Sequence, residues 1–350
     1  MNDFPNYYTI FHSEMQESVV QYSEKKEKYF SHFSYGKDQF MEQYRIGVDL
    51  GGTNIAAGIV DDHYRILHKG SVKTALPRPA EAICQDIDGL CRRLCEEAGI
   101  SFDDIEAIGI GSPGSISRGV VKRAGNLGFR NVPLADMVSA LTNKPVSLKN
   151  DANAAALGEL IAGSGKQCSS LIAVTLGTGV GGGIVLDGKI VEGFCGAGGE
   201  VGHIVVSPNG LPCTCGNRGC LEAYCSATAL IQATKEAMIA HPESLLNTLA
   251  TPDTVNGKTA FDGMRAGDPA ATEVVDTFIT MLSYGVVSMI RTIQPEVICI
   301  GGGLSKEGET LLAPLRDKVW AQIRCDTEEA RTKLVVATLG NDAGIIGAAG

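Results

Sequence analysis

The sequence is poor in basic residues and has neither a long apolar run nor the pattern of a secretory leader. Its 30 Lys and Arg are outnumbered by 40 Asp and Glu, which gives a net charge of −10. This balance argues against a general nucleic-acid surface, although backbone N–H groups can bind an anion without basic side chains. No apolar stretch approaches the roughly 20 residues that cross a bilayer. We therefore expect a cytoplasmic globular protein with no membrane or nucleic-acid partner.

Two common nucleotide-binding signatures are also missing. The chain has no G-x-x-x-x-G-K-[ST] sequence, and no convincing G-x-G-x-x-G opens a helix, which argues against a Walker P-loop and a dinucleotide fold. Glycine itself is abundant, with 43 residues that gather after apolar runs. Three clusters follow predicted strands: DLGGTN (49–54), TLGTGVGGG (175–183) and GGGLS (301–305). One alone could be an ordinary turn, but three together favour loops that bind nucleotide phosphate.

The first two glycine clusters belong to an internal repeat. The segments IGVDLGGTNIAAGIVDD and IAVTLGTGVGGGIVLD align Leu50 with Leu176 and, with one residue fewer, Gly58 with Gly183. Each copy reads as a β-run, a glycine turn and a second β-run, so we expect a hairpin in each. A repeat of this kind indicates two similar α/β domains whose glycine turns face a shared cleft.

The expected domain boundaries follow from this repeat and from the change in composition near residue 43. We predict a small domain formed by 44–149 plus 340–350, and a large domain formed by 150–339. Residues 1–43 precede them as an extension, which is either helical or disordered or lies upstream of a true start at Met41.

Local patterns predict several further elements. A strand is expected over 64–69, and helical periodicity runs from 80 to 98 and stops at Gly99. Three cysteines in that helix share one face, so they are expected to be buried. The other predicted elements are strands at 105–110, 146–148, 296–300 and 334–338, a helix at 152–162, a largely helical region at 226–292 with a loop near 252–258, and a last helix at 343–350.

The stretch 200–222 concentrates potential metal ligands. His203 stands ten residues before Cys213, and Cys213, Cys215 and Cys220 follow C-x-C-x4-C spacing. One imidazole and three thiolates form a closed tetrahedral set that suits a structural zinc ion. Because four protein ligands complete that shell, a catalytic zinc is not expected here.

The same histidine and cysteines allow two further interpretations. They could be a core histidine and scattered buried thiols, or Cys195 or Cys225 could replace one of the four ligands. The chain holds 11 cysteines in total, and an odd number of thiols beside a metal-like cluster points to a reducing compartment.

Two carboxylates have a structural and a functional interpretation. Asp49 ends a predicted strand before the first glycine cluster, where it could stabilise the turn or hold hydrated Mg²⁺. Asp151 follows Asn150 at the start of a predicted helix, where it could be the N-cap or could accept a hydroxyl proton during phosphoryl transfer. With phosphate loops expected nearby, we favour the base.

Together these motifs resemble the ROK family of sugar kinases (repressor, open reading frame, kinase), and most closely its bacterial glucokinases. The resemblance covers about residues 44–350 and rests on DLGGTN, GSPG, AGNLGF, NDANAAALGE, TLGTGVGGGIVLDGKI, GAGGEVGH, CTCGNRGCLE and GGGLS. It implies two actin-like (ribonuclease H-like) α/β domains flanking a cleft, with a zinc-stabilised loop in the larger domain. It also implies transfer from ATP with Mg²⁺ to the 6-hydroxyl of a hexose, with D-glucose favoured, by a homodimer or homotetramer.

The resemblance also implies a role for individual residues. Asp151 falls on the catalytic base, and His203 would bind zinc through one ring nitrogen and a sugar hydroxyl through the other. Residues on the sugar side are Gly114, Asn126, Asn150, Asp151, Glu200, His203 and Glu222. Residues on the nucleotide and phosphate side are Asp49, Gly51, Gly52, Thr53, Asn54, Gly177, Thr178, Gly179, Gly301, Gly302 and Gly303. Thr178 is expected at the γ-phosphate.

Several other functions stay open from the sequence. The sugar could be an N-acylmannosamine, fructose, mannose or allose, and the protein could be a non-catalytic sugar-sensing regulator or a chaperone-like actin-fold ATPase. The family's repressors carry an N-terminal DNA-binding domain, and residues 1–40 have neither its length nor its helix-turn-helix pattern. The end at Gly350 also comes earlier than the end of the family's last helix.

Overall fold

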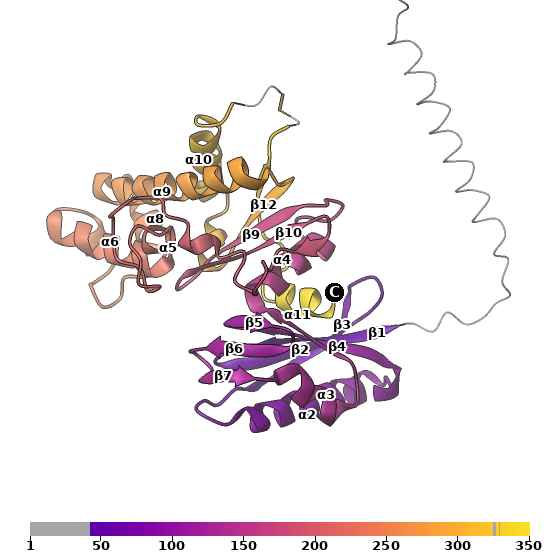
Figure 1. Ribbon diagram of the computed structural model, residues 1–350. Coiled ribbons are helices and arrows are strands. Elements are labelled where there is room, and N and C mark those ends of the chain that lie inside the picture. Colours follow the sequence, from indigo (N-terminus) through magenta and orange to yellow (C-terminus); the bar gives the residue numbers. More distant parts are fainter. Residues whose placement is uncertain (1–42, 325–326, 329) are drawn as a thin grey trace, which may run out of the picture. The chain divides into compact units, whose positions relative to one another are not determined.

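Two five-stranded sheets of the same strand order carry the fold in the computed structural model (Figure 1). The structure describes residues 43–324, 327–328 and 330–350. The expectations for the N-terminal extension fall on residues that, apart from residue 43, lie outside this range.

The first sheet is built around two buried parallel strands. Its order is β3 (Ile66–Lys73), β2 (Asn54–Val60), β1 (Tyr44–Leu50), β4 (Ile105–Ser112) and β8 (Val146–Asn150). β1 pairs antiparallel with β2 and parallel with β4, and β4 pairs parallel with β8. The central strands are almost continuously apolar because helices cover both faces of the sheet.

The second sheet repeats this topology. Its order is β11 (Lys189–Ile190), β10 (Val180–Leu186), β9 (Leu171–Leu176), β12 (Val297–Gly301) and β13 (Lys333–Val336). β9 pairs antiparallel with β10 and parallel with β12, as β1 does with β2 and β4. The two hairpins expected from the internal repeat are therefore confirmed.

The register of the hairpins confirms the predicted alignment of the two copies. Gly58 lies opposite Gly47, and Gly183 lies opposite Ala173. Each partner stands three residues before the leucine that ends its strand, and the second turn is one residue shorter.

Each of two helices follows a strand of one sheet but packs on the other sheet, an arrangement called here the sheet exchange. α4 (Asp151–Ala162) follows β8 of the first sheet but packs on β9 and β10 of the second. α11 (Asp342–Ala349) follows β13 of the second sheet but packs on β1 and β4 of the first, and the two helices contact each other. A Cβ on Gly158 or Gly347 would collide with a backbone carbonyl of the other helix. Glycine at these positions therefore permits the close crossing.

The predicted helix after the first hairpin has the predicted bounds. α2 (Ala80–Ala98) ends at Gly99, whose φ of 69° allows the left-handed cap, and its three cysteines are buried. α3 (Leu134–Thr142) packs against α2. A small sheet of β5 (Ser115–Ser117), β6 (Val120–Ala124) and β7 (Phe129–Val132) was not predicted.

One predicted strand boundary is wrong for a local reason. β3 begins at Ile66, not at Tyr64, because Tyr64 has a φ of 60° and lies in a turn. The Asp61 carboxylate stabilises that turn by accepting backbone hydrogen bonds from His63 and Arg65 at 2.9 and 2.8 Å.

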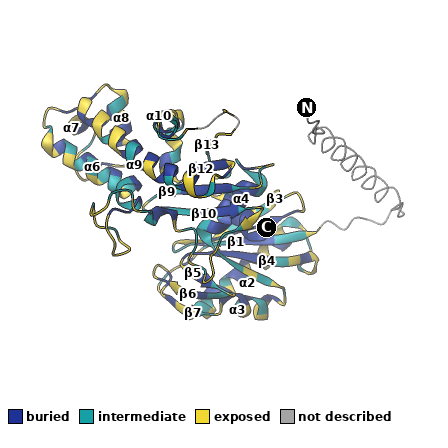
Figure 2. Cartoon of the chain, turned by 45° about the horizontal axis from the view of Figure 1, so that its top comes forward, coloured by how far each residue is buried: buried dark blue, intermediate teal, exposed yellow. Residues whose placement is uncertain are grey.

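The region 226–292 is helical, with a loop before α8, as expected. Its helices and the neighbouring ones are α5 (Glu222–Cys225), α6 (Ala227–Ala240), α7 (Leu246–Leu249), α8 (Thr259–Arg265), α9 (Pro269–Ile293) and α10 (Glu309–Trp320). Short 3-10 turns are η1 (Phe102–Asp104), η2 (Val201–His203) and η3 (Gly303–Glu307). α9 is long and apolar enough to span a membrane by composition, yet 61% of its apolar window is buried inside the protein. Figure 2 shows the buried central strands and the exposed outer faces of α7 and α8.

Candidate functional site

Asn150 caps the helix that begins at Asp151. Its Oδ1 accepts hydrogen bonds from the backbone N–H groups of Ala152 and Asn153 at 3.0 and 3.2 Å, and its Nδ2 donates to the carbonyl of Gly114 at 3.1 Å. Asp151 is the first helical residue, so the alternative that it serves as the N-cap is wrong. Its carboxylate accepts one hydrogen bond, from the N–H of Ala152 at 2.9 Å. The remaining acceptor capacity of Asp151 is available to a ligand.

Asp49 and Asp151 are two acids whose pKa values are both raised. Burial raises the pKa of Asp49 to about 6, and the negative charge of Asp151 contributes to this rise. Burial also raises the pKa of Asp151, against the opposing effect of its hydrogen bond from Ala152. Two buried carboxylates that repel each other favour a cation or a proton between or beside them.

The first glycine turn closes through its own backbone. The N–H of Gly51 donates to the carbonyl of Asn54 at 2.9 Å, and the hydroxyl of Thr74 donates to the carbonyl of Gly51 at 2.7 Å. Thr53 and Asn54 at the tip are exposed. A Cβ on Gly52 would lie 3.8 Å from Asn126. The turn therefore lies beside one of the residues expected on the sugar side.

The second glycine turn has the same kind of closure and an added anchor. The N–H of Gly177 donates to the carbonyl of Gly179 at 3.0 Å. The first residues of α6 hold the turn from the other side, because Ala227 N–H donates to Gly177 and the Thr228 hydroxyl donates to the carbonyl of Thr178, at 2.8 and 2.7 Å. The Thr178 side chain stays exposed at the tip.

The four predicted metal ligands come together. His203 ends η2, and its potential ligand atom lies within 4.8 Å of those of Cys213, Cys215 and Cys220, which are also within 4.8 Å of one another. The Nδ1 atom of His203 is 3.6 Å from the Cys213 Sγ, and the Sγ atoms of Cys215 and Cys220 are 3.7 Å apart. A tetrahedron with Zn–S bonds of about 2.3 Å has edges of about 3.8 Å. The donor set therefore fits zinc.

The alternative ligands lie outside this cluster. Cys225 is buried, and its thiol donates to the carbonyl of Phe278 at 3.7 Å. Cys195 is exposed in the preceding glycine-rich loop. Neither thiol is grouped with the four potential ligand atoms in the described part of the chain.

Glu222 connects the loop that carries Cys213, Cys215 and Cys220, called here the cysteine loop, to the second glycine hairpin, formed by β9 and β10. Its Oε2 accepts the backbone N–H of Val180 at 3.0 Å, and its Oε1 accepts the hydroxyl of Thr214 at 2.7 Å and the Cys213 thiol at 3.6 Å. Burial raises the pKa of this carboxyl, but the hydrogen bonds from Thr214 and Val180 outweigh it and hold the pKa below its usual range. Glu200 shares a turn with His203, whose N–H donates to the Glu200 carbonyl at 3.1 Å.

A cavity of about 550 Å³ opens beside the third glycine cluster. Gly301, Gly302 and Gly303, for which a place on the nucleotide side stays a prediction, line it. Sequence reasoning missed the other polar groups that line it: Glu159, Thr175, Ser305, Lys306, Thr338 and Asn341. Glu159 stands inside the NDANAAALGE motif, but no spacing rule pairs it with residues about 180 positions later in the chain.

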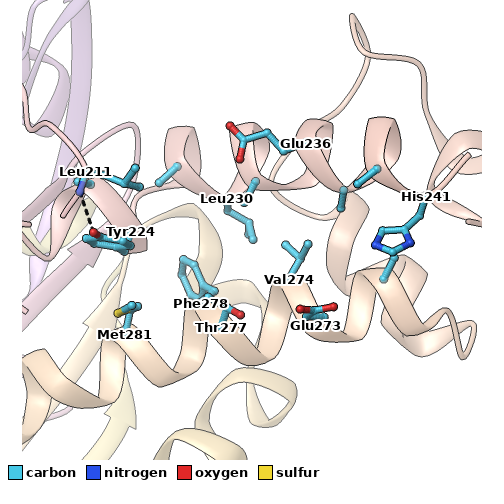
Figure 3. Close-up of a pocket in the computed structure, with 16 residues that line it drawn as sticks. Leu211, Tyr224, Leu230, Glu236, His241, Glu273, Val274, Thr277, Phe278 and Met281 are labelled. Atoms are coloured by element: carbon cyan, nitrogen blue, oxygen red, sulfur yellow. Dashed lines mark hydrogen bonds between the residues drawn. The ribbon is translucent and has the colours of Figure 1, made fainter. Parts of the chain in front are cut away.

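A second cavity, of about 410 Å³, lies between α6 and α9 (Figure 3). Its walls are mainly apolar and include Leu230, Val274 and Phe278, and it contains none of the predicted site residues. One end reaches the cysteine loop, where the N–H of Leu211 donates to the hydroxyl of Tyr224 at 2.8 Å.

Comparisons with known proteins agree with this architecture. The ROK family profile matches residues 45–350. The glucokinase of Thermotoga maritima is 42% identical over 310 residues, which cover 87% of this chain and 95% of that protein. A ROK glucokinase from Streptomyces griseus, solved with glucose and AMPPNP, is 38% identical with a TM-score of 0.70 over 87% of this chain and 98% of that one. A ROK hexokinase from Thermus thermophilus is 35% identical with a TM-score of 0.73 over 88% and 97%.

The predicted α/β class is confirmed by the likeness to these ROK kinase structures, and the predicted family is confirmed by the profile match across both sheets. The chain belongs to the ROK family.

Proposed function

We propose that the protein transfers the γ-phosphoryl group of ATP to the 6-hydroxyl of a hexose, with D-glucose as the substrate and glucose 6-phosphate and ADP as products. The observation that carries this proposal is the Asp151 carboxylate at the start of α4, which is not needed as a cap because Asn150 fills that role. The glucokinase relatives, one of them solved with glucose and an ATP analogue, support the choice of substrates.

Asp151 is the proposed base. Phosphoryl transfer passes through a loose transition state, so the residue mainly orients the attacking hydroxyl and takes its proton late. Burial raises the pKa of Asp151, which makes it a stronger base than an exposed aspartate. In this step the hexose oxygen forms a bond to phosphorus, the bond to ADP breaks, and the hydroxyl proton goes to the carboxylate.

The glycine turns are the proposed phosphate site. Each presents backbone N–H groups at an exposed tip, which suits phosphate oxygens without basic side chains. Asp49 would hold hydrated Mg²⁺ beside them, and the ion would neutralise phosphate charge during transfer. The cavity lined by Gly301, Gly302 and Gly303 would take the nucleoside part of ATP.

The proposed hexose wall comes from several segments. Its members are Gly114, Asn126, Asn150, Glu200, His203 and Glu222. Because Nδ1 of His203 lies on the cysteine side, its Nε2 is the nitrogen left for a sugar hydroxyl. Zinc on His203, Cys213, Cys215 and Cys220 would be structural and would fix the orientation of that ring. The domain boundaries and a homodimeric or homotetrameric assembly in the cytoplasm remain predictions.

A coupled assay of ADP release against a panel of hexoses tests this function. We expect the highest kcat/KM with glucose and lower values with mannose, fructose, allose and N-acetylmannosamine. If the purified protein binds glucose but releases no ADP with any sugar, a sugar-sensing regulator is the correct function. If ATP is hydrolysed equally with and without sugar, the protein is an ATPase and the kinase proposal fails.

A further inference from the structure

Glu159 is a buried carboxylate at the wall of the 550 Å³ cavity. It lies on α4 two turns after Asp151, and only 3% of the residue is exposed. Its hydrogen-bond partners are the N–H groups of Ser164 and Leu339 and the hydroxyl of Thr338, at 2.8, 2.7 and 3.3 Å. None of these three groups carries a positive charge. Burying a carboxylate on neutral donors alone is costly, so an uncharged residue would serve a purely structural purpose at a lower free-energy cost.

The three bonds join distant parts of the chain. Ser164 follows the end of α4, whereas Thr338 and Leu339 belong to the segment 338–341 that connects β13 to α11. A Cβ on Gly163 would collide with the Glu159 carboxylate, so the local backbone is shaped to admit it. The carboxylate therefore fixes the segment 338–341 to the helix that starts at Asp151.

The fixed segment borders the cavity. Thr338, Gly340 and Asn341 line it together with Gly301, Gly302 and Gly303. Without Glu159, the N–H of Leu339 would lose its acceptor, and the segment would be free to leave this position. The cavity would then lose the part of its wall that Thr338, Gly340 and Asn341 form.

We propose that Glu159 is a positioning residue for ATP, which acts by holding residues 338–341 as a preformed wall of the nucleotide pocket. This inference rests on the proposed function, because it takes the cavity as the nucleoside site. It predicts different effects on the two substrates: loss of Glu159 should weaken nucleotide binding and leave hexose binding unchanged. A preformed wall should strengthen ATP binding, because a mobile wall would have to be ordered each time ATP binds.

Glu159→Gln tests the proposal, because the amide keeps the shape and places an N–H₂ group against N–H donors. We expect the Kd of Mg-AMPPNP by calorimetry and the KM for ATP to rise ~10–100-fold, since one backbone N–H loses its acceptor and the remaining hydrogen bonds lose the negative charge. The KM for glucose and the Kd of glucose should stay as in the native protein. Thr338→Val removes one donor and should raise the Kd of Mg-AMPPNP by ~2–5-fold.

Ser164→Ala is the matched control. It removes a buried hydroxyl that makes no bond to Glu159 but keeps the backbone N–H that donates to Glu159. Its nucleotide affinity should equal that of the native protein. If Glu159→Gln unfolds, the other two variants still decide the proposal. A higher Kd of Mg-AMPPNP in Thr338→Val than in Ser164→Ala supports it, and equal Kd values overturn it.

Two results would overturn the proposal. One is native nucleotide affinity in folded Glu159→Gln, and the other is an equal rise in the constants for ATP and glucose, as general loosening would cause. The assignment also fails together with the kinase function if the native protein binds no Mg-AMPPNP. Nucleotide binding without transfer to any hexose would remove the proposed function alone, and the comparison of Kd values would still decide the role of Glu159.

Discussion

Glu222 accepts the backbone N–H of Val180 at 3.0 Å, so one carboxylate joins the cysteine loop to the second glycine hairpin. Its other oxygen is held by Thr214 at 2.7 Å. Glu222, which was expected only to contact the sugar, therefore also connects the proposed metal site to the proposed phosphate site.

Replacing Glu222 should impair the use of both substrates, glucose and ATP. In Glu222→Ala both acceptor oxygens are removed, so the N–H of Val180 and the hydroxyl of Thr214 lose their shared partner. We expect kcat/KM to fall ~10–100-fold for glucose and for ATP alike. Thr214→Val is the control, because it removes one exposed hydrogen bond and leaves the bond to Val180. A fall in kcat/KM for glucose alone would show that Glu222 acts only as a sugar contact.

Asp151→Asn should abolish turnover and spare binding. The amide keeps the size of the side chain but cannot take a hydroxyl proton, so kcat should fall ~10²–10⁴-fold while calorimetry still detects glucose. Asp136→Asn is the matched control, because it neutralises an exposed acid in the first turn of another helix. Unchanged kcat in Asp151→Asn would remove this residue from the role of base.

Cys215→Ser should lower the zinc content and the activity together. Loss of one of four ligands opens the coordination shell, and we expect activity to fall at least ~10-fold as the cysteine loop loses its fixed shape. Metal analysis and activity are measured on the same preparation. Cys195→Ser, at an exposed cysteine outside the cluster, should change neither. Full activity in a zinc-free Cys215→Ser protein would separate the metal from function.

Asp49→Asn should stabilise the ligand-free protein at neutral pH while abolishing activity. The pKa of Asp49 rises from 3.8 to about 6 through burial and through the charge of Asp151, so between these values the folded state binds more protons than the unfolded state. Stability is therefore present below pH 3.8 and is lost as the pH rises through about 6, by up to about 3 kcal/mol.

Thermal unfolding of Asp49→Asn should accordingly show a higher Tm than the native protein at pH 8 and a clearly smaller gain at pH 4.5. Asp62→Asn changes an exposed acid after the far end of β2 and should show no such pH-dependent gain. A Tm below that of the native protein at pH 8 would contradict the electrostatic cost assigned to Asp49.

Gly347→Ala should destabilise the crossing of α4 and α11. The added methyl group would meet the carbonyl of Ala154, so the helices must separate, and we expect a loss of about 1–3 kcal/mol in the free energy of unfolding. Gly89→Ala is the matched control inside α2. A Cβ there meets nothing within 4 Å, so the change should stabilise by up to about 1 kcal/mol. Equal effects at both positions, measured by urea unfolding, would contradict the close crossing.

The sequence by itself determined the elements whose signals are local. Gly99 marked the end of α2, and the repeated leucine-glycine pattern predicted both hairpins with the register that Gly58 and Gly183 adopt. The spacing of His203 and three cysteines likewise identified four potential metal ligands that the structure brings together. These predictions succeed because turn chemistry, strand alternation and short ligand spacing depend on neighbours within a few residues.

Only the tertiary structure decided which partners the functional residues have. Neighbouring residues 150 and 151 could each cap a helix, and the bonds from the N–H groups of Ala152 and Asn153 to Asn150 Oδ1 show which one does. The sheet exchange of α4 and α11, and the hydrogen bond from the Leu339 N–H to Glu159, join segments about 180 residues apart. Such contacts are chosen by packing, burial and donor satisfaction in three dimensions, which leave no fixed spacing in the sequence.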